Sequence, residues 1–135
     1  MKARAFLLSL FLSITQASCV HRPMIGSVDF CNLMSNAKTF SGENIALEAK
    51  AAQGINYEII LVDDRCSGRI VVKIREEDEH KEAVELLMSS IFSRRDGDPL
   101  GSASGAMIPV TITGKFIWQA EDRLSFLIMD EIILR

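Results

Sequence analysis

The sequence predicts a mainly β fold in which five strands form a barrel, one helix lies between strands 3 and 4, and a short helix precedes the first strand. Three observations support this prediction. Five segments alternate apolar and polar residues or are rich in β-branched residues, as half-buried strands are. One segment changes to a period of about 3.6 residues, as an amphipathic helix does. A glycine within the fourth segment marks a position where a barrel strand can bend.

The elements before the central helix follow from local patterns. Residues 29–36 form the short helix, because their apolar side chains fall on one side of it. Ser41 and Gly42 then form a turn. Residues 44–52 are the first strand, whose predicted buried face consists of Ile45, Leu47, Ala49 and Ala51. Residues 57–62 and 69–75 are β-rich runs, and the polar segment between them predicts a hairpin.

The central helix and the last two strands complete the pattern. Residues 76–92 are predicted to form one helix, with acidic residues at its start and basic residues after its end, an arrangement that complements the helix dipole. Residues 96–105 are rich in Gly, Ser, Asp and Pro and are predicted to form a loop. Residues 108–118, with Gly114 inside them, and residues 123–134 supply the last strands. Three strands, a helix and two strands is the order of an OB-fold barrel.

The amino terminus predicts export. Lys2 and Arg4 precede an apolar run at residues 6–14, which is followed by small residues, as in a secretory signal peptide. The run is too short for a normal membrane-spanning helix. We therefore expect a signal peptide at residues 1–18, a linker at 19–27 and a single OB-like domain at 28–135, working outside the cytoplasm.

Charge limits the choice of partners. Removing the signal peptide changes the formal net charge from -3 to -5, because residues 1–18 contain two of the 15 basic residues and none of the 18 acidic residues. An acidic domain has no overall field that attracts a phosphate backbone. Nucleic-acid binding would therefore need a local basic patch.

The three cysteines are an odd set for an oxidising compartment. If Cys19 becomes the lipidated first residue of the mature chain, Cys31 and Cys66 can pair, and we predict that disulfide. The segment ending in Ala17, Ser18 and Cys19 resembles the processing box of bacterial lipoproteins, although Gln16 stands where an aliphatic residue is usual. Ordinary cleavage after Ala17 explains the same residues, so both kinds of processing remain open.

Three segments resemble small exported bacterial OB-like proteins. They are residues 28–42, with Cys31 in a helix before the turn; residues 61–66, with sequence LVDDRC; and residues 110–116, with sequence VTITGKF. The resemblance covers most of residues 28–134 and implies an OB-like fold. Its motifs are structural, so it implies no activity.

The patterns that could indicate catalysis each have a structural explanation. Glu76 and His80 have the spacing of two metal ligands on one helix face, but no third ligand is evident, and charges at a helix start explain them. Asp63 and Asp64 could act as an acid and a base, but in this turn they are better explained as turn formers. We therefore predict no metal site.

Two further catalytic patterns fail on spacing. Residues 101–105 (GSASG) have Ala103 where a nucleophile elbow needs serine. Cys31 and Cys66 are too far apart in sequence for a redox pair separated by two residues. The sequence therefore predicts a protein that is not an enzyme and has no cofactor.

Binding is the remaining function class. OB barrels bind ligands on the outer face of strands 2 and 3 and on nearby loops. The candidate residues in that region are Tyr57, Arg69, Lys73 and Arg75, of which the three basic residues share one strand parity. Few aromatic residues accompany them, which disfavours single-strand nucleic-acid binding.

We therefore expect an envelope-associated, non-catalytic binding or structural module that interacts with protein. The alternative is an oligosaccharide- or nucleic-acid-binding OB-fold protein. The expected partner is an envelope protein or an anionic ligand. The expected location is the periplasm or the outer membrane, with membrane contact only through a lipid on Cys19.

Overall fold

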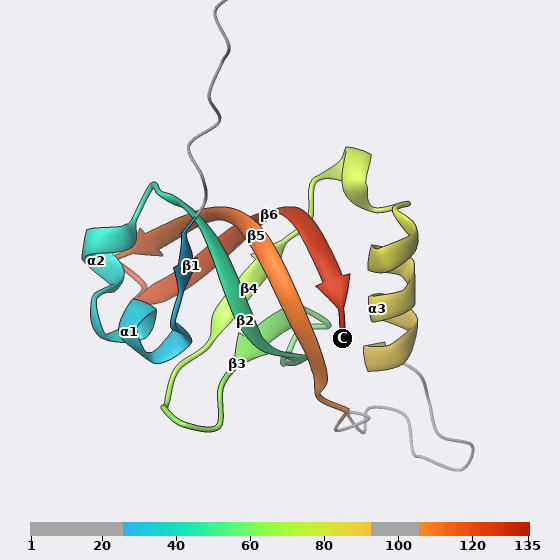
Figure 1. Cartoon of the computed structure of the whole chain (residues 1–135), viewed down its shortest axis with the longest axis horizontal. Coiled ribbons are helices and arrows are strands. Elements are labelled where there is room, and N and C mark those ends of the chain that lie inside the picture. The colour runs from blue at the N-terminus through green and yellow to red at the C-terminus, as the bar shows by residue number, and fades with distance from the viewer. Residues whose placement is uncertain (1–25, 93–105) are drawn as a thin grey trace, which may run out of the picture.

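Five strands close into a barrel in the computed structural model, which describes residues 26–92 and 106–135 (Figure 1). The strands are β2 (Asn44–Gln53), β3 (Ile59–Val62), β4 (Ile70–Lys73), β5 (Ile108–Gln119) and β6 (Leu124–Leu134). Their order is β2–β3–β4–β6–β5, and β5 pairs back onto β2 to close the barrel. β4 and β6 run parallel, whereas the other barrel neighbours are antiparallel. The predicted OB-like fold is confirmed.

Alternation along each strand separates the barrel core from its outer surface. In β2, Ile45, Leu47 and Ala51 are buried and belong to the core, as predicted, and Ala49 packs against the core while partly exposed. The strands β5 and β6 supply the largest part of the remaining core: Val110, Ile112, Phe116, Leu127, Met129 and Ile132. This packing of apolar side chains inside the barrel is the main source of its stability.

Gly114 lies opposite a β-bulge in β6. The register between β5 and β6 shifts between Thr113 and Gly114, so that Thr113 pairs with Glu131, Gly114 pairs with Met129, and Asp130 is the extra residue of a β-bulge. A Cβ atom on Gly114 would lie 2.2 Å from the Ile128 carbonyl oxygen. Only glycine therefore allows this close approach of the two backbones, so the glycine marks an irregularity in the pairing of β5 with β6.

Two short helices lie at one end of the barrel. They are α1 (Phe30–Ser35) and α2 (Ala37–Phe40), and the Asp29 carboxylate caps α1 by accepting a hydrogen bond from the Asn32 amide at 3.0 Å. The strand β1 (Ser27–Val28), which the sequence did not predict, pairs in parallel with Ala46 and Leu47 of β2. A two-residue strand is too short to produce a recognisable alternation.

A disulfide joins α1 to the loop between β3 and β4. Cys31 and Cys66 are bonded, with their Cα atoms 5.7 Å apart, which confirms the predicted pair. Beside it, the Arg65 guanidinium donates to Asp29 at 2.7 Å. The loop is thus held to α1 by a covalent bond and an ion pair.

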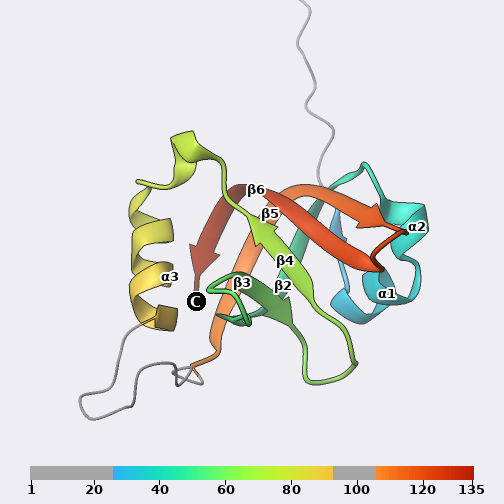
Figure 2. The same cartoon turned by 180° about the vertical axis from the view of Figure 1, so that it is seen from behind.

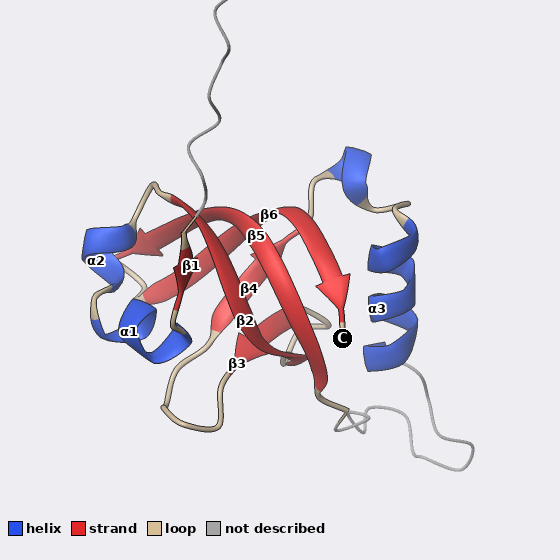
Figure 3. Cartoon of the chain, in the orientation of Figure 1, coloured by secondary structure: helices blue, strands red, loops and turns tan. Residues whose placement is uncertain are grey.

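The prediction of one helix over residues 76–92 is wrong in its first part. The chain forms a 3-10 turn, η1 (Glu76–Asp78), and the helix α3 (Glu82–Phe92) begins six residues after the predicted start, as Figure 3 shows. The Asp78 side chain turns inward and binds both Arg75 and Lys81, which stabilises a tight turn where a continuous helix was expected. Val84, Leu87 and Ile91 then bury one face of α3 against the opposite end of the barrel from α1 (Figure 1).

Two predicted strands are also shorter than expected. β3 begins at Ile59 rather than at Tyr57, because Tyr57 has a left-handed backbone with φ of 58° that cannot continue a strand. β4 covers Ile70–Lys73 rather than residues 69–75. The predicted signal peptide, Cys19 and the loop at residues 96–105 lie outside the described residues. Within them, no helix combines the length and apolar character that crossing a membrane requires.

Candidate functional site

An apolar row crosses the outer surface of four neighbouring strands. It consists of Ile60, Val71, Phe126 and Ile117, which are successive cross-strand partners on β3, β4, β6 and β5. Figure 2 shows β4 and β6 on the side where neither α1 nor α3 covers them. Because Val71 is buried but lies outside the core cluster, its burial comes from its neighbours on this outer face.

The apolar row departs from ordinary sheet chemistry. An antiparallel sheet with one face toward water normally places polar residues on that face. Here the adjoining outward positions Val62, Leu124 and Ile128 are also apolar and only partly buried. Extended apolar patches on a protein surface mark sites of interaction. The apolar row coincides with the face that OB barrels use for ligands.

Basic residues flank the apolar row on both sides. Lys73 lies two residues after Val71 in β4 and therefore on the same face. Its ammonium lies 5.1 Å from the centroid of the Phe126 ring, within the range of a cation–π contact. Lys115 pairs with Ile128 on the same side, and Arg69 precedes β4 on the other side. Within residues 26–92 and 106–135, none of these three side chains forms an ion pair. They can therefore accept an anionic group.

The structure separates the four predicted ligand-binding residues. Arg69 and Lys73 flank the apolar row, whereas Tyr57 is 72% exposed in the loop between β2 and β3, with its ring centroid 6.3 Å from that of Phe92. The expectation that Arg75 joins Arg69 and Lys73 on one solvated strip is wrong. β4 ends at Lys73, and Arg75 turns away to bind acidic residues.

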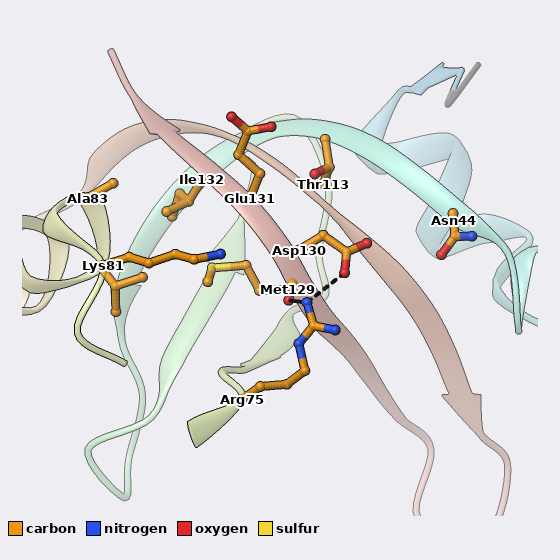
Figure 4. Close-up of a pocket in the computed structure, with 10 residues that line it drawn as sticks. Asn44, Arg75, Lys81, Ala83, Thr113, Met129, Asp130, Glu131 and Ile132 are labelled. Carbon is orange, nitrogen blue, oxygen red and sulfur yellow. Dashed lines mark hydrogen bonds and ion pairs between the residues drawn. The ribbon is translucent and has the colours of Figure 1, made fainter. Parts of the chain in front are cut away.

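Arg75 instead organises a pocket beside the β-bulge. Its guanidinium donates to Asp78 at 3.0 Å, to Asp130 at 2.9 Å and to the Met129 carbonyl at 3.2 Å, while Lys81 lies 2.6 Å from Asp78. Figure 4 shows Arg75 reaching Asp130 of β6. We call this space of about 970 Å³ the bulge pocket; it lies between α3 and β6.

The electrostatics of the bulge pocket are largely satisfied within it. The Lys81 ammonium, followed by the Arg75 guanidinium, lowers the pKa of Asp78 below its usual value. Hydrogen bonding to Asp78 raises the pKa of Arg75. Because Arg75 and Lys81 are already paired with carboxylates, they are less available to bind a ligand. We therefore assign the cluster a structural role, linking η1 and α3 to the bulge.

The acidic pair in the loop between β3 and β4 also has structural partners. The Asp63 carboxylate accepts hydrogen bonds from the Arg65 amide at 2.8 Å and from the Arg65 guanidinium, which holds the pKa of Asp63 at about 2. Asp64 pairs with Lys50. An ionised, turn-forming Asp63 fits the predicted structural explanation better than proton transfer does.

Metal-ligand geometry is lacking in the described part of the chain. No group of three or more His, Cys, Asp or Glu side chains converges there. The His80 side chain is 90% exposed, and its Nδ1 atom faces Glu85 at 3.8 Å. The GSASG segment at residues 101–105 lies outside the described residues.

Sequence reasoning missed the apolar row and the bulge pocket, although each left a trace. Residues 59–62 and 70–72 are uninterrupted apolar runs, which indicate strands with apolar side chains on both faces. Asp130 and Glu131 are two consecutive polar residues that interrupt the alternation of β6, as a bulge does. These patterns are visible in the sequence, but only the pairing between strands shows that they form an apolar row and a pocket.

The chain matches no protein-family model, and comparison with curated proteins found no match either. One similar solved structure is a chain from Leishmania major Friedlin that is assigned as an aspartyl-tRNA synthetase. The two chains share 8% sequence identity with a TM-score of 0.46, over 87% of this chain and 22% of the other. This chain therefore spans less than a quarter of that protein, and a likeness at this level carries no argument about function.

Proposed function

We propose that this chain is an exported, envelope-associated binding module without catalytic activity, and that its apolar row binds a protein partner. The observation that carries the proposal is the apolar row itself, because Ile60, Val71, Phe126 and Ile117 occupy outward positions where a solvated sheet face would be polar.

The chemistry of the face favours a polypeptide over a base or a sugar. Binding of single-stranded nucleic acid relies on successive aromatic side chains that stack on bases. The apolar row contains one aromatic residue, Phe126, and Trp118 has the inward parity of the buried Phe116. Aliphatic side chains instead fit the apolar side chains of a peptide, and Arg69, Lys73 and Lys115 fit acidic residues beside them. We therefore infer a partner segment that combines apolar and acidic residues.

The disulfide supports export. Disulfides persist in oxidising compartments and are rare in the cytosol. Cys31 and Cys66 are bonded, and this leaves Cys19 as the unpaired cysteine, consistent with either lipidation or removal with the signal peptide. Mass spectrometry of the mature amino terminus tests this part of the proposal. A chain that retains residues 1–18 in cells would contradict it.

The binding proposal is tested by selecting peptides from a random phage-displayed library against the protein purified with its disulfide intact. We expect the selected peptides to combine apolar residues with Asp or Glu, and Lys73→Glu to weaken their binding at least tenfold. Lys38→Glu is the matched control, because it makes the same charge change on α2, at the other end of the barrel.

The same two variants separate the alternatives. Labelled single-stranded DNA and anionic oligosaccharides are titrated at near-physiological salt, because phosphate contacts weaken strongly with salt. Submicromolar binding of either ligand that Lys73→Glu abolishes and Lys38→Glu retains would replace the protein partner by that ligand. If the library yields no peptide sensitive to Lys73→Glu, the apolar row is not a protein-binding site.

A further inference from the structure

A second apolar surface lies at the α3 end of the barrel, separate from the apolar row. Val84, Met88 and Phe92 are spaced by four residues and therefore share one side of α3, on which Val84 is buried against the barrel and Met88 is exposed. Ile74, Val84 and Met88 line a groove of about 490 Å³, which we call the α3 groove. Met88 is 38% exposed there, although methionine is an apolar residue.

The loop between β2 and β3 extends this surface beyond the end of the α3 groove. Tyr57 contacts the Phe92 ring, and the neighbouring Ile55 is 83% exposed. Tyr57 adopts its left-handed backbone although that conformation favours glycine or asparagine. An apolar stripe, with Val84 buried at its base, therefore runs from Ile74 along α3 to Tyr57.

The rim of the α3 groove is acidic. Glu79 and Glu85 line it together with His80. Glu79 forms no ion pair in the described part of the chain, and Glu85 faces only His80. The nearest lysine in sequence, Lys81, is bound to Asp78 and does not neutralise them. A partner that fits this groove carries apolar side chains with positive charges beside them.

We propose that the α3 groove binds a basic amphipathic segment of another protein. The stripe from Val84 to Phe92 covers eight residues of helical rise, about 12 Å, which matches roughly two turns of a partner helix. A second copy of this chain would bring the same acidic rim against Glu79 and Glu85, and an anionic membrane would be repelled by them. The charge of the rim therefore selects a cationic partner over both.

The test uses a labelled 18-residue helical peptide built only from Leu and Lys, titrated against the full processed protein at near-physiological salt. We expect saturable one-to-one binding in the micromolar range and at least tenfold weaker binding of the corresponding Leu and Glu peptide. Met88→Ser should weaken binding of the Leu and Lys peptide at least fivefold. Leu86→Ser is the matched control, because Leu86 is 51% exposed on a different side of α3.

The charge requirement has its own pair of variants. Glu85→Gln should weaken binding at least threefold, whereas Glu121→Gln, which removes the same charge from the exposed turn between β5 and β6, should change it less than twofold. Equal losses for the two members of either pair would show nonspecific attraction and overturn the proposal. Concentration-dependent dimers that Met88→Ser dissociates would assign the groove to a second copy. Lys73→Glu should leave this binding unchanged, which separates the α3 groove from the apolar row.

Discussion

The two halves of the barrel's outer surface follow different chemistry. The half built from β2 and the first residues of β5 is polar, and its outward positions include Glu48, Lys50, Thr111 and Thr113. Its charges are paired nearby, because Glu48 binds Arg135 and Lys50 binds Asp64. This half shows the usual result of alternation, with apolar residues in the core and polar residues toward water.

The half built from β3, β4, β6 and the last residues of β5 carries the apolar row and leaves Arg69 and Lys73 without an ion pair among the described residues. Both halves enclose the same core, so core packing cannot explain the difference. The contrast shows that the outer surface of this barrel has a solvated, polar half and a half whose apolar and basic residues suit a binding partner.

The β3–β4 region also differs from the long strands in how it is held together. β2 and β5 have 10 and 12 residues, whereas β3 and β4 have four each. Short strands form few ladder hydrogen bonds, so the β3–β4 region depends more on the Cys31–Cys66 bond and on the Arg65–Asp29 ion pair.

The largest expected effect comes from removing the disulfide. Cys31→Ser with Cys66→Ser should lower the free energy of unfolding by about 3 to 4 kcal/mol, because the bond closes a loop spanning a sequence separation of 35 residues. Urea denaturation measures the loss. Hydrogen exchange should accelerate more in β3 and β4 than in β2 and β5. Uniform acceleration in both halves would contradict the difference in how they are held.

The next effect concerns Gly114, which lies opposite the bulge at Asp130. Gly114→Ala should lower the free energy of unfolding by roughly 1 to 3 kcal/mol, because the added Cβ would overlap the Ile128 carbonyl and force the strands apart. Gly26→Ala is the control, since nothing lies within 4 Å of the position of its Cβ. Thermal unfolding of the two variants compares them, and equal stability would show that the bulge tolerates a side chain.

Changes in the apolar row should affect stability less than Gly114→Ala does, and they should mainly weaken binding. Ile60→Thr with Ile117→Thr makes this half resemble the polar half while retaining β-branched side chains. The affinity for peptides selected on the wild type should fall at least tenfold, equal to about 1.4 kcal/mol. Ile133→Thr is the matched control, because Ile133 pairs with Thr111 on the polar half. An equal loss from that control would remove the distinction between the halves.

The smallest expected effect is the pH dependence contributed by Asp63. Its folded pKa of about 2 lies below the usual 3.8, mainly because Arg65 donates hydrogen bonds to the carboxylate. The resulting stabilisation is present above about pH 4 and is lost as the pH falls toward 2. Asp63→Asn should therefore be less stable than wild type at pH 5 and nearly equal to it at pH 2, as measured by urea midpoints. A difference that persists at pH 2 would assign the effect to packing.

Local patterns were sufficient for much of this fold. The strands at residues 44–52, 108–118 and 123–134 and the helix at 29–36 agree closely with β2, β5, β6 and α1, because long alternation and a capped apolar face are properties of neighbouring residues. The Cys31–Cys66 pair followed from the prediction of export and from cysteine parity. The number of cysteines and the apolar run at the amino terminus can both be read directly from the sequence.

The candidate site depended on residues that are distant in sequence. Parity placed Arg69, Lys73 and Arg75 on one face, but Asp78 and Asp130 withdraw Arg75 from it. Parity also separates the two faces of a strand without showing which strands are neighbours. The apolar row exists only because the register of four strands aligns Ile60, Val71, Phe126 and Ile117.

The sequence by itself determined the order of strands and helices along the chain, the special position of Gly114 and the cysteine pair, since these follow from local patterns, residue type and cysteine count. Only the tertiary structure decided where η1 ends, which cations remain unpaired and which apolar residues gather outside the core. The physical reason is that charge pairing and side-chain burial depend on distances across the barrel. Those distances are set by strand register and by the bulge at Asp130, neither of which a single strand specifies.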